Sequence, residues 1–370
     1  MNPLLELEQH GQSVWLDSIR RSMITSGELQ RLIAEDGLRG LTSNPTIFEK
    51  AVSAGSDYDA QVREIVLRDP DISPTDLYGR VVITDIQMAA DALRPVYEAS
   101  SGLDGYVSLE VSPPVAHDTE ATLAEVRHLW HAVNRPNLFV KIPGTPEGIP
   151  AVETCLAEGI NINITLLFSR AHYQAVAEAY LRAVSRLSDP SRVASVASFF
   201  VSRVDTKVDT KLKEIGTAEA LGLLGKAAIA NAKLSYRRFE EIFHGEHFAD
   251  LHRNGARVPR CLWASTSTKN PAYPDTMYVD NLIGPETVNT MPMETLAAFR
   301  DHGRAVPTLH QGVEEAEADL QRLAALGLSL LEVGEELQAE GLRLFGESYE
   351  KSLAALDRKR VQILAGEETS

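Results

Sequence analysis

The segment NLFVKIPGTPEGIPAVETCLAEGININITLLF (137–168) contains the pattern on which the fold depends. Two short runs rich in β-branched and aromatic residues, 137–143 and 161–168, flank turn residues and a stretch of helical character. A strand–helix–strand order of this kind is typical of a parallel βαβ unit. The same rhythm recurs along the chain. We predict eight strands, at 13–17, 38–44, 105–111, 137–143, 161–168, 193–201, 260–265 and 276–283.

Eight such units favour a closed (β/α)8 barrel of the α/β class, with additional helices. A doubly wound open sheet is the alternative, but no GxGxxG motif follows an early strand. We expect one barrel domain over residues 1–370. Residues 217–258 read as a helical insertion between the sixth and seventh strands, and residues 311–370 as a long helical C-terminal segment packed on the barrel.

Composition narrows the possible functions. The 370 residues carry 36 Lys and Arg against 52 Asp and Glu, a formal net charge of −16, which argues against nucleic-acid binding. No run of about 18 apolar residues occurs, and the N-terminus has no signal-peptide pattern, so we expect no membrane span and a cytoplasmic location. The two cysteines, Cys155 and Cys261, belong to no metal-binding motif, and we expect no metal and no cofactor.

Polar side chains interrupt strands that should be apolar on both faces. In NINIT (161–165), isoleucine alternates with polar residues, so the period of two directs the polar side chains into the barrel. Similar residues lie at or near the ends of the four preceding strands, where barrel enzymes place their active sites. The set comprises Asp17, Asn44, Glu110, Lys141, Asn163 and Thr165.

A lysine inside a barrel suggests covalent chemistry. Desolvation favours the free amine, which attacks carbonyl groups, so we predict a Schiff base on Lys141. Asp17 and Glu110 supply the acid and base that such chemistry requires, and Thr165 can hold a water beside Glu110. Asn44 and Asn163 can bind substrate hydroxyl groups. The alternative for each residue is an ordinary polar group or salt bridge at the barrel rim.

Four segments, FVKIPGT, INITLLFS, LTSNPTIF and TVNTMP, resemble the signature segments of transaldolases. The similarity runs in order from about residue 11 to about residue 303, and the length is similar to that of a larger bacterial subgroup. The resemblance implies a barrel of the class I aldolase type that uses no metal. It also implies transfer of a dihydroxyacetone unit from a ketose phosphate (fructose 6-phosphate or sedoheptulose 7-phosphate) to an aldose phosphate.

The resemblance implies a role for each candidate residue. Lys141 matches the Schiff-base lysine of the fourth strand, and Glu110 the acid/base glutamate of the third. Asp17 matches the aspartate that handles the proton of the C4 hydroxyl. Asn44 matches the asparagine of the TxNP turn. Asn163 and Thr165 match the fifth-strand asparagine and threonine.

The phosphate site matches the family less closely. Ser198 and Arg203 correspond to a serine and an arginine at the sixth strand, where Arg suits bidentate phosphate contacts. After the seventh strand, WASTSTKNP departs from the family's serine and arginine. It offers Ser265 and, two residues later than expected, Lys269.

Two other functions stay open at this point. Related fructose 6-phosphate aldolases carry glutamine and tyrosine where this chain has Glu110 and Phe200, which favours transfer over simple cleavage. A non-catalytic barrel that binds sugar phosphates is the second alternative. The expected partners are sugar-phosphate substrates, and the chain is expected to be a monomer or a homodimer.

Overall fold

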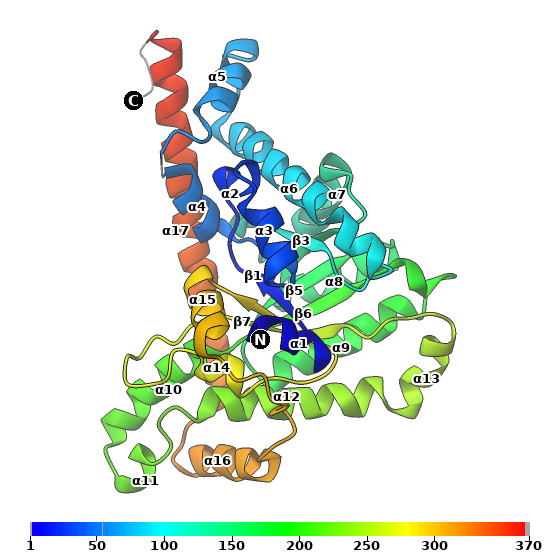
Figure 1. Ribbon diagram of the computed structural model, residues 1–370, viewed down its shortest axis with the longest axis vertical. Coiled ribbons are helices and arrows are strands. Elements are labelled where there is room, and N and C mark those ends of the chain that lie inside the picture. Colours follow the sequence, from blue (N-terminus) through cyan, green and yellow to red (C-terminus); the bar gives the residue numbers. More distant parts are fainter. Residues whose placement is uncertain (1, 54, 367–370) are drawn as a thin grey trace.

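The centre of the molecule is a closed barrel of parallel strands that follow one another in sequence order (Figure 1). The computed structural model describes residues 2–53 and 55–366. The strands are β1 (Gln12–Leu16), β2 (Leu38–Thr42), β3 (Tyr106–Glu110), β4 (Leu138–Pro143), β5 (Ile162–Leu167), β6 (Ser195–Phe200), β7 (Arg260–Ala264) and β8 (Thr287–Met291). Strand β1 pairs with β8 and closes the barrel. The predicted (β/α)8 fold is thereby confirmed.

The eighth predicted strand was wrong. Residues 276–283 contain the short helix α14 (Met277–Asp280), and β8 begins only at Thr287. Tyr278, Val279, Leu282 and Ile283 are all buried. Their spacing of one, three and one residues fits a helical turn better than the period of two that a strand requires. A short apolar run does not distinguish these two cases by its composition.

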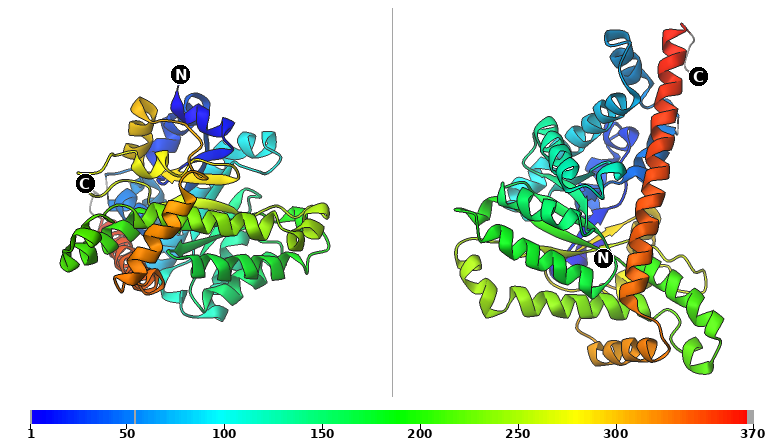
Figure 2. Two further views of the ribbon diagram at one scale, coloured as in Figure 1. Left: turned by 90° about the horizontal axis from the view of Figure 1, so that it is seen from below. Right: turned by 180° about the vertical axis from the view of Figure 1, so that it is seen from behind.

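Helices surround the barrel and extend beyond it (Figure 2). The α-helices are α1 (Pro3–Gln9), α2 (Arg21–Thr25), α3 (Glu28–Glu35), α4 (Pro45–Ser53), α5 (Asp59–Arg68), α6 (Pro74–Ala99), α7 (Thr119–Val133), α8 (Gly148–Ala157), α9 (Arg170–Val184), α10 (Ser202–Ile215), α11 (Ala218–Leu221), α12 (Ala227–Phe243), α13 (Glu246–Arg253), α14, α15 (Met293–His302), α16 (Val313–Ala325) and α17 (Leu330–Leu364). Two short 3₁₀ helices are η1 (Pro113–Val115) and η2 (Pro190–Arg192).

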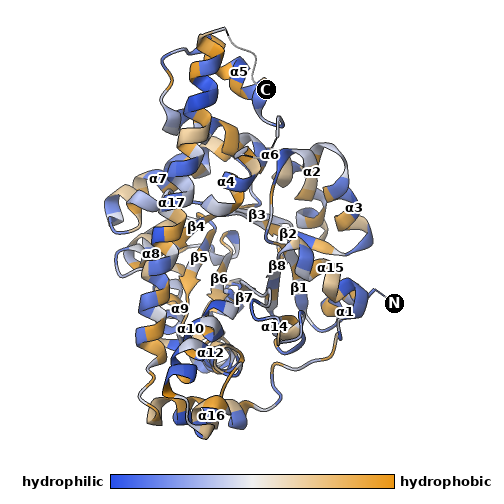
Figure 3. Cartoon of the chain, turned by 90° about the vertical axis from the view of Figure 1, so that its left-hand side faces the viewer, coloured by the Kyte–Doolittle hydropathy of each residue, from blue (hydrophilic) through white to orange (hydrophobic). Residues whose placement is uncertain are grey.

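Local sequence signals set the ends of the longer helices. At the start of α6, the Ser73 side chain accepts a hydrogen bond from the Asp76 amide, and a proline follows Ser73. At the start of α7, Asp118 accepts from the Ala121 amide, and the helix ends at Asn134 in the left-handed conformation. Hydrophilic and hydrophobic residues alternate along many of the helices, as expected of helices with one buried face (Figure 3).

The N-terminal end of the barrel is filled by aromatic side chains and one buried ion pair. The rings of Tyr106 and Phe139 stack with centroids 4.2 Å apart. Arg260 on β7 lies 2.9 Å from the carboxylate of Asp104, and Trp15 Nε1 donates to the same carboxylate at 3.0 Å. Packed side chains therefore close the interior of the barrel at this end.

The C-terminal helix α17 follows the long axis of the molecule (Figures 1 and 2). It packs against α10 near its start and against α4, α5 and α6 further along. It also contacts β5, so a segment from the end of the chain reaches the barrel itself. Among the described residues, no helix has the combination of length and hydrophobicity that a membrane span requires.

Candidate active site

A cavity of about 720 Å³ opens at the C-terminal end of the barrel. Eight of the ten candidate residues line it: Asp17, Asn44, Lys141, Thr165, Ser198, Arg203, Ser265 and Lys269. Glu110 instead borders a neighbouring cavity that also touches Asn44. Asn163 lines neither of these two cavities and is fully buried. The fold therefore brings most of the predicted residues together in one space.

Lys141 and Glu110 form a buried pair. They occupy paired positions on β4 and β3, and the Nζ atom of Lys141 lies 2.9 Å from Oε2 of Glu110. Nζ also donates to the backbone carbonyl of Ser43 at 2.9 Å. Burial raises the pKa of Glu110, although the Lys141 ammonium opposes this shift. A carboxylate with a raised pKa in contact with the amine is well placed to take the proton that the amine must lose before it attacks a carbonyl.

Asp17 follows β1 and is held from two sides. Its amide donates to the carbonyl of Met291 at 2.8 Å, which ties it to the end of β8. Its carboxylate accepts a 2.6 Å hydrogen bond from the hydroxyl of Thr42. Burial raises the pKa of Asp17, while the Thr42 hydrogen bond and the cations of Lys141, Arg203 and Lys269 lower it. These two hydrogen bonds fix the position of a buried carboxyl group that lines the cavity.

The polar residues of β5 lie at two depths. Asn163 donates to Ser108 Oγ at 3.1 Å and accepts from Ser198 Oγ at 2.6 Å, so it links β3, β5 and β6 inside the barrel. Thr165, two residues further on, lines the cavity. Its buried hydroxyl has no hydrogen-bond partner within the described part of the chain. Thr165 therefore lines the cavity with a buried hydroxyl that has no hydrogen-bond partner among the described residues, two residues beyond Asn163 on β5.

Asn44 lies in the turn between β2 and α4. Its Oδ1 accepts a 3.0 Å hydrogen bond from the Ile47 amide, as an N-terminal cap of a helix does. This bond fixes the plane of the amide while the residue still borders the cavity. Asn44 therefore both caps the start of α4 and forms part of the cavity wall.

Two cations face the cavity from different segments. Arg203 lies in the first turn of α10, with its guanidinium 5.6 Å from the centre of the Phe200 ring. Lys269, in the loop after β7, donates to Ser267 Oγ. Burial lowers the pKa of both side chains. Two partly desolvated cations that line the same cavity form a suitable site for a phosphate group.

The two segments that carry these cations are bonded to each other. The Ser202 amide donates to the Ser265 carbonyl at 3.1 Å, and their hydroxyl oxygens lie 3.0 Å apart. Ser265 has a φ of 55°, a conformation that non-glycine residues rarely adopt. The strained turn at Ser265 re-aims the loop toward α10, which brings Lys269 to the cavity that Arg203 also lines.

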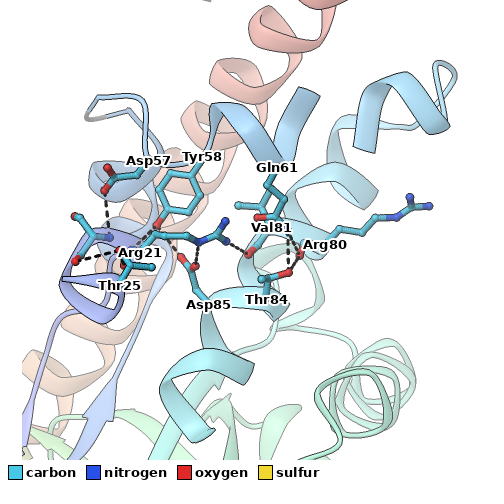
Figure 4. Close-up of polar contacts among 10 residues, drawn as sticks. Arg21, Thr25, Asp57, Tyr58, Gln61, Arg80, Val81, Thr84 and Asp85 are labelled. Carbon is cyan, nitrogen blue, oxygen red and sulfur yellow. Dashed lines mark hydrogen bonds and ion pairs between the residues drawn. The ribbon is translucent and has the colours of Figure 1, made fainter. Parts of the chain in front are cut away.

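A polar network on α6 supports another part of the cavity wall (Figure 4). Asp85, fully buried, accepts a 2.6 Å bond from Arg21 Nε and a 2.7 Å bond from the Tyr58 hydroxyl. The Arg21 guanidinium also lies over the Tyr58 ring, 4.9 Å from its centre. Burial raises the pKa of Asp85, and its two partners oppose the shift. The network holds α2, and with it the cavity residues Arg20 and Ser22, against α6.

Several site residues were missed by sequence reasoning. Thr42 and Thr290, whose hydroxyl oxygens lie 2.7 Å apart, support Asp17. Both are polar residues inside strands, so the alternation that identified Lys141 could have found them. Phe345 on α17 also lines the cavity. Nothing in the sequence indicated this, because Phe345 is far along the chain from the other site residues.

Among the described residues, no group of three or more His, Cys, Asp or Glu side chains is arranged to hold a metal ion.

Comparisons with known proteins agree with this geometry. The family model described as Transaldolase/Fructose-6-phosphate aldolase matches residues 14–356. A protein of Thiobacillus denitrificans named transaldolase is 48% identical over 360 residues, 96% of this chain and 100% of its own length. A transaldolase of Thermobifida fusca is 47% identical over 98% of this chain and 99% of its own. A third, from Mycolicibacterium smegmatis, is 46% identical over 96% of each chain. This similarity over almost the whole length shows that the chain belongs to the transaldolase/fructose-6-phosphate aldolase family and that it is an enzyme of the transaldolase type.

Proposed function

We propose that Lys141 forms a Schiff base with a ketose phosphate and passes a dihydroxyacetone unit to an aldose phosphate. The donors are sedoheptulose 7-phosphate and fructose 6-phosphate, and the acceptors are glyceraldehyde 3-phosphate and erythrose 4-phosphate, as in the non-oxidative pentose phosphate pathway. The observation that carries this proposal is the 2.9 Å contact between Lys141 Nζ and Glu110 Oε2 beside a cavity that Asp17 also lines.

The steps follow from the positions of three side chains. Lys141 Nζ gives a proton to Glu110 and attacks the ketone carbon, and the carbinolamine then loses water to form the imine. A water held by Thr165 carries protons between Glu110 and this centre. Asp17 takes the proton of the C4 hydroxyl, the C3–C4 bond breaks, and its electrons enter the imine as an enamine. The aldose leaves, the enamine adds to the acceptor aldehyde, and hydrolysis restores the amine.

The phosphate of the sugar is proposed to bind Arg203 and Lys269, with Ser265 nearby. Asn44 and Ser198 are proposed to contact the sugar hydroxyl groups from the cavity wall, which they both line. Asn163 is proposed to act from below, because its carbonyl accepts from Ser198 at 2.6 Å. Binding the phosphate at a distance from the amine fixes the carbonyl for attack.

Transfer to an aldehyde is favoured over release to water. At the third-strand acid/base position the chain has Glu110, which can exchange protons, and the neighbour of Arg203 at the cavity is Phe200, which has no hydroxyl group.

We further propose that the barrel and its extra helices form one domain and that the protein acts in the cytoplasm as a monomer or a homodimer. Light scattering of the purified protein would determine its oligomeric state.

Borohydride trapping tests the covalent step. The protein is incubated with fructose 6-phosphate, reduced, digested and analysed by mass spectrometry. We expect a reduced three-carbon adduct on the peptide containing Lys141, and its absence from the Lys141→Met variant. Lys233, a partly desolvated lysine on α12 outside the cavity, provides the control position. An adduct on Lys233 instead of Lys141, or none with the sugar phosphate still bound, would contradict the proposal.

A further inference from the structure

Leu166 on β5 has an unusual backbone conformation. Its φ is 59°, and it directly follows Thr165. The register between β5 and β6 also shifts between Ile164 and Leu167. Leucine has no side-chain group that could hydrogen-bond its own backbone in the left-handed region, so this conformation is strained. Such strain persists only where the surroundings hold the backbone, and it is found mainly at functional sites.

The group that holds this backbone comes from the end of the chain. The amide nitrogen Nε2 of Gln338 on α17 donates to the Leu166 carbonyl at 3.0 Å. It also donates to the Gly144 carbonyl, just beyond β4, at 3.1 Å. The Gly144 amide in turn donates to the Thr165 carbonyl at 2.8 Å. One buried amide therefore joins the ends of the two strands that carry Lys141 and Thr165.

The face of α17 around Gln338 is shaped for this contact. Gly341 lies one turn further along, and a Cβ atom there would stand 3.0 Å from Leu166 Cδ2 and 3.8 Å from Arg203 Nη1. Phe345, another turn along, lines the cavity. Residues spaced by three and four lie on one face of a helix. The close approach at Gly341 brings this whole face of α17 against the end of β5.

We propose that Gln338 is a positioning residue for the transfer reaction, which orients the Thr165 hydroxyl by holding the strained backbone at Leu166. This rests on the proposed role of Thr165 in water transfer at the Schiff base. Glutamine suits the task because one nitrogen carries two N–H donors and can serve two carbonyl groups. Methionine has a similar length and no donor, so Gln338→Met removes the two bonds and keeps most of the volume.

The matched control is Asn137, at the opposite end of the barrel. Its Nδ2 also donates to two backbone carbonyls, those of Ala90 at 2.8 Å and Gly105 at 2.7 Å. Both amides are buried, so Gln338→Met and Asn137→Leu each remove two buried hydrogen bonds to backbone carbonyls and each lower the melting temperature. We expect only Gln338→Met to lower kcat per folded molecule, by about 10- to 100-fold, with KM for fructose 6-phosphate changed less than about twofold.

A double variant tests the route of the effect. If Gln338 acts through Thr165, adding Gln338→Met to Thr165→Val costs no further activity, whereas independent effects would multiply. The proposal is overturned if Gln338→Met has the same kcat as the unmodified protein, if Asn137→Leu lowers kcat as much as Gln338→Met does, or if the double variant shows the product of both losses. Should Gln338→Met not fold, Gln338→Glu keeps the length, removes the donors when ionised and is expected to lower kcat in the same way.

Failure of the Schiff-base proposal is recognised separately. Borohydride trapping on the unmodified protein tests Lys141 without any change at Gln338. An adduct on Lys141 together with full activity of Gln338→Met would overturn only the positioning role.

Discussion

At the scale of the single residue, the contact of Lys141 with Glu110 is the most informative feature. Both side chains are almost fully buried, with exposed fractions of 5% and 3%. A buried ion pair rarely stabilises a protein more than apolar residues of the same volume would, because both charges lose their hydration. The pair is therefore better explained by chemistry than by stability, and the raised pKa of Glu110 fits a group that exchanges protons.

Arg203 leads to a prediction about substrate recognition. Because its guanidinium is proposed to bind the phosphate, Arg203→Ala should raise KM for fructose 6-phosphate by about 10- to 100-fold. Cleavage of unphosphorylated fructose should change little. Steady-state kinetics with both sugars would measure the difference. Lys207, one turn further on α10 and paired with Glu336 and Glu340, is the control, and Lys207→Ala should leave both KM values unchanged. An equal loss for both sugars in Arg203→Ala would exclude this role.

At the scale of the element, α10 anchors both cations of the proposed phosphate site. It carries Arg203 in its first turn. Two residues after Arg203, the Asp205 carboxylate accepts hydrogen bonds from the Ala228 amide at 2.7 Å and from the Tyr278 hydroxyl at 2.9 Å. Tyr278 belongs to the same β7–β8 connection as Lys269. The helix thus holds in place the connection that carries Lys269.

This anchor predicts a dependence of stability on pH. Burial raises the pKa of Asp205 to about 7, from an ordinary value of 3.8. The folded protein therefore holds this proton where the unfolded chain has released it. The contribution of Asp205 to stability is full below about pH 4 and is lost as the pH rises toward 7. Asp205→Asn, which stays neutral, should flatten the decline of melting temperature over this range.

The control for this experiment is Asp209, one turn along the same helix. Its carboxylate accepts from the Tyr273 hydroxyl at 2.6 Å and from the Gly225 amide at 2.9 Å. Thermal unfolding of Asp205→Asn, Asp209→Asn and the unmodified protein would be recorded from pH 4 to pH 8. The expectation fails if the slope of melting temperature against pH is the same for Asp205→Asn and the unmodified protein.

At the scale of the whole molecule, stability and chemistry lie at opposite ends of the barrel. The N-terminal end contains the buried pair of Arg260 and Asp104, far along the strands from Lys141. Asp104→Leu would leave the Arg260 charge buried and unpaired, which costs about 3–5 kcal/mol. Denaturant unfolding should show this loss, while kcat per folded molecule should not change.

The compensating variant completes this test. Replacing both partners, Asp104→Leu with Arg260→Met, removes the unpaired charge and should recover most of the lost stability. If the double variant is as unstable as Asp104→Leu alone, the ion pair is not the reason for the loss. A fall in kcat in either variant would contradict the separation of the two ends.

The sequence by itself determined the barrel and most of the chemical groups in it. Strands buried on both faces must be nearly all apolar. Polar residues that alternate with apolar ones along such a strand, such as Lys141 and Asn163, therefore stood out in the sequence. Seven of the eight strands were predicted within two residues of their observed bounds, because turn residues punctuate each unit. The eighth failed because a short apolar run fits a helical turn as well as a strand.

Only the tertiary structure decided which of these groups meet. The contact of Lys141 with the Ser43 carbonyl, the support of Asp17 by Thr42, and the clamp of Gln338 on Leu166 all join segments remote in sequence. Periodicity reports which face of a strand a residue occupies, but it carries no information on which distant segment packs there. That choice depends on how the closed barrel and the helix α17 fill space together, which is a property of the whole packed chain.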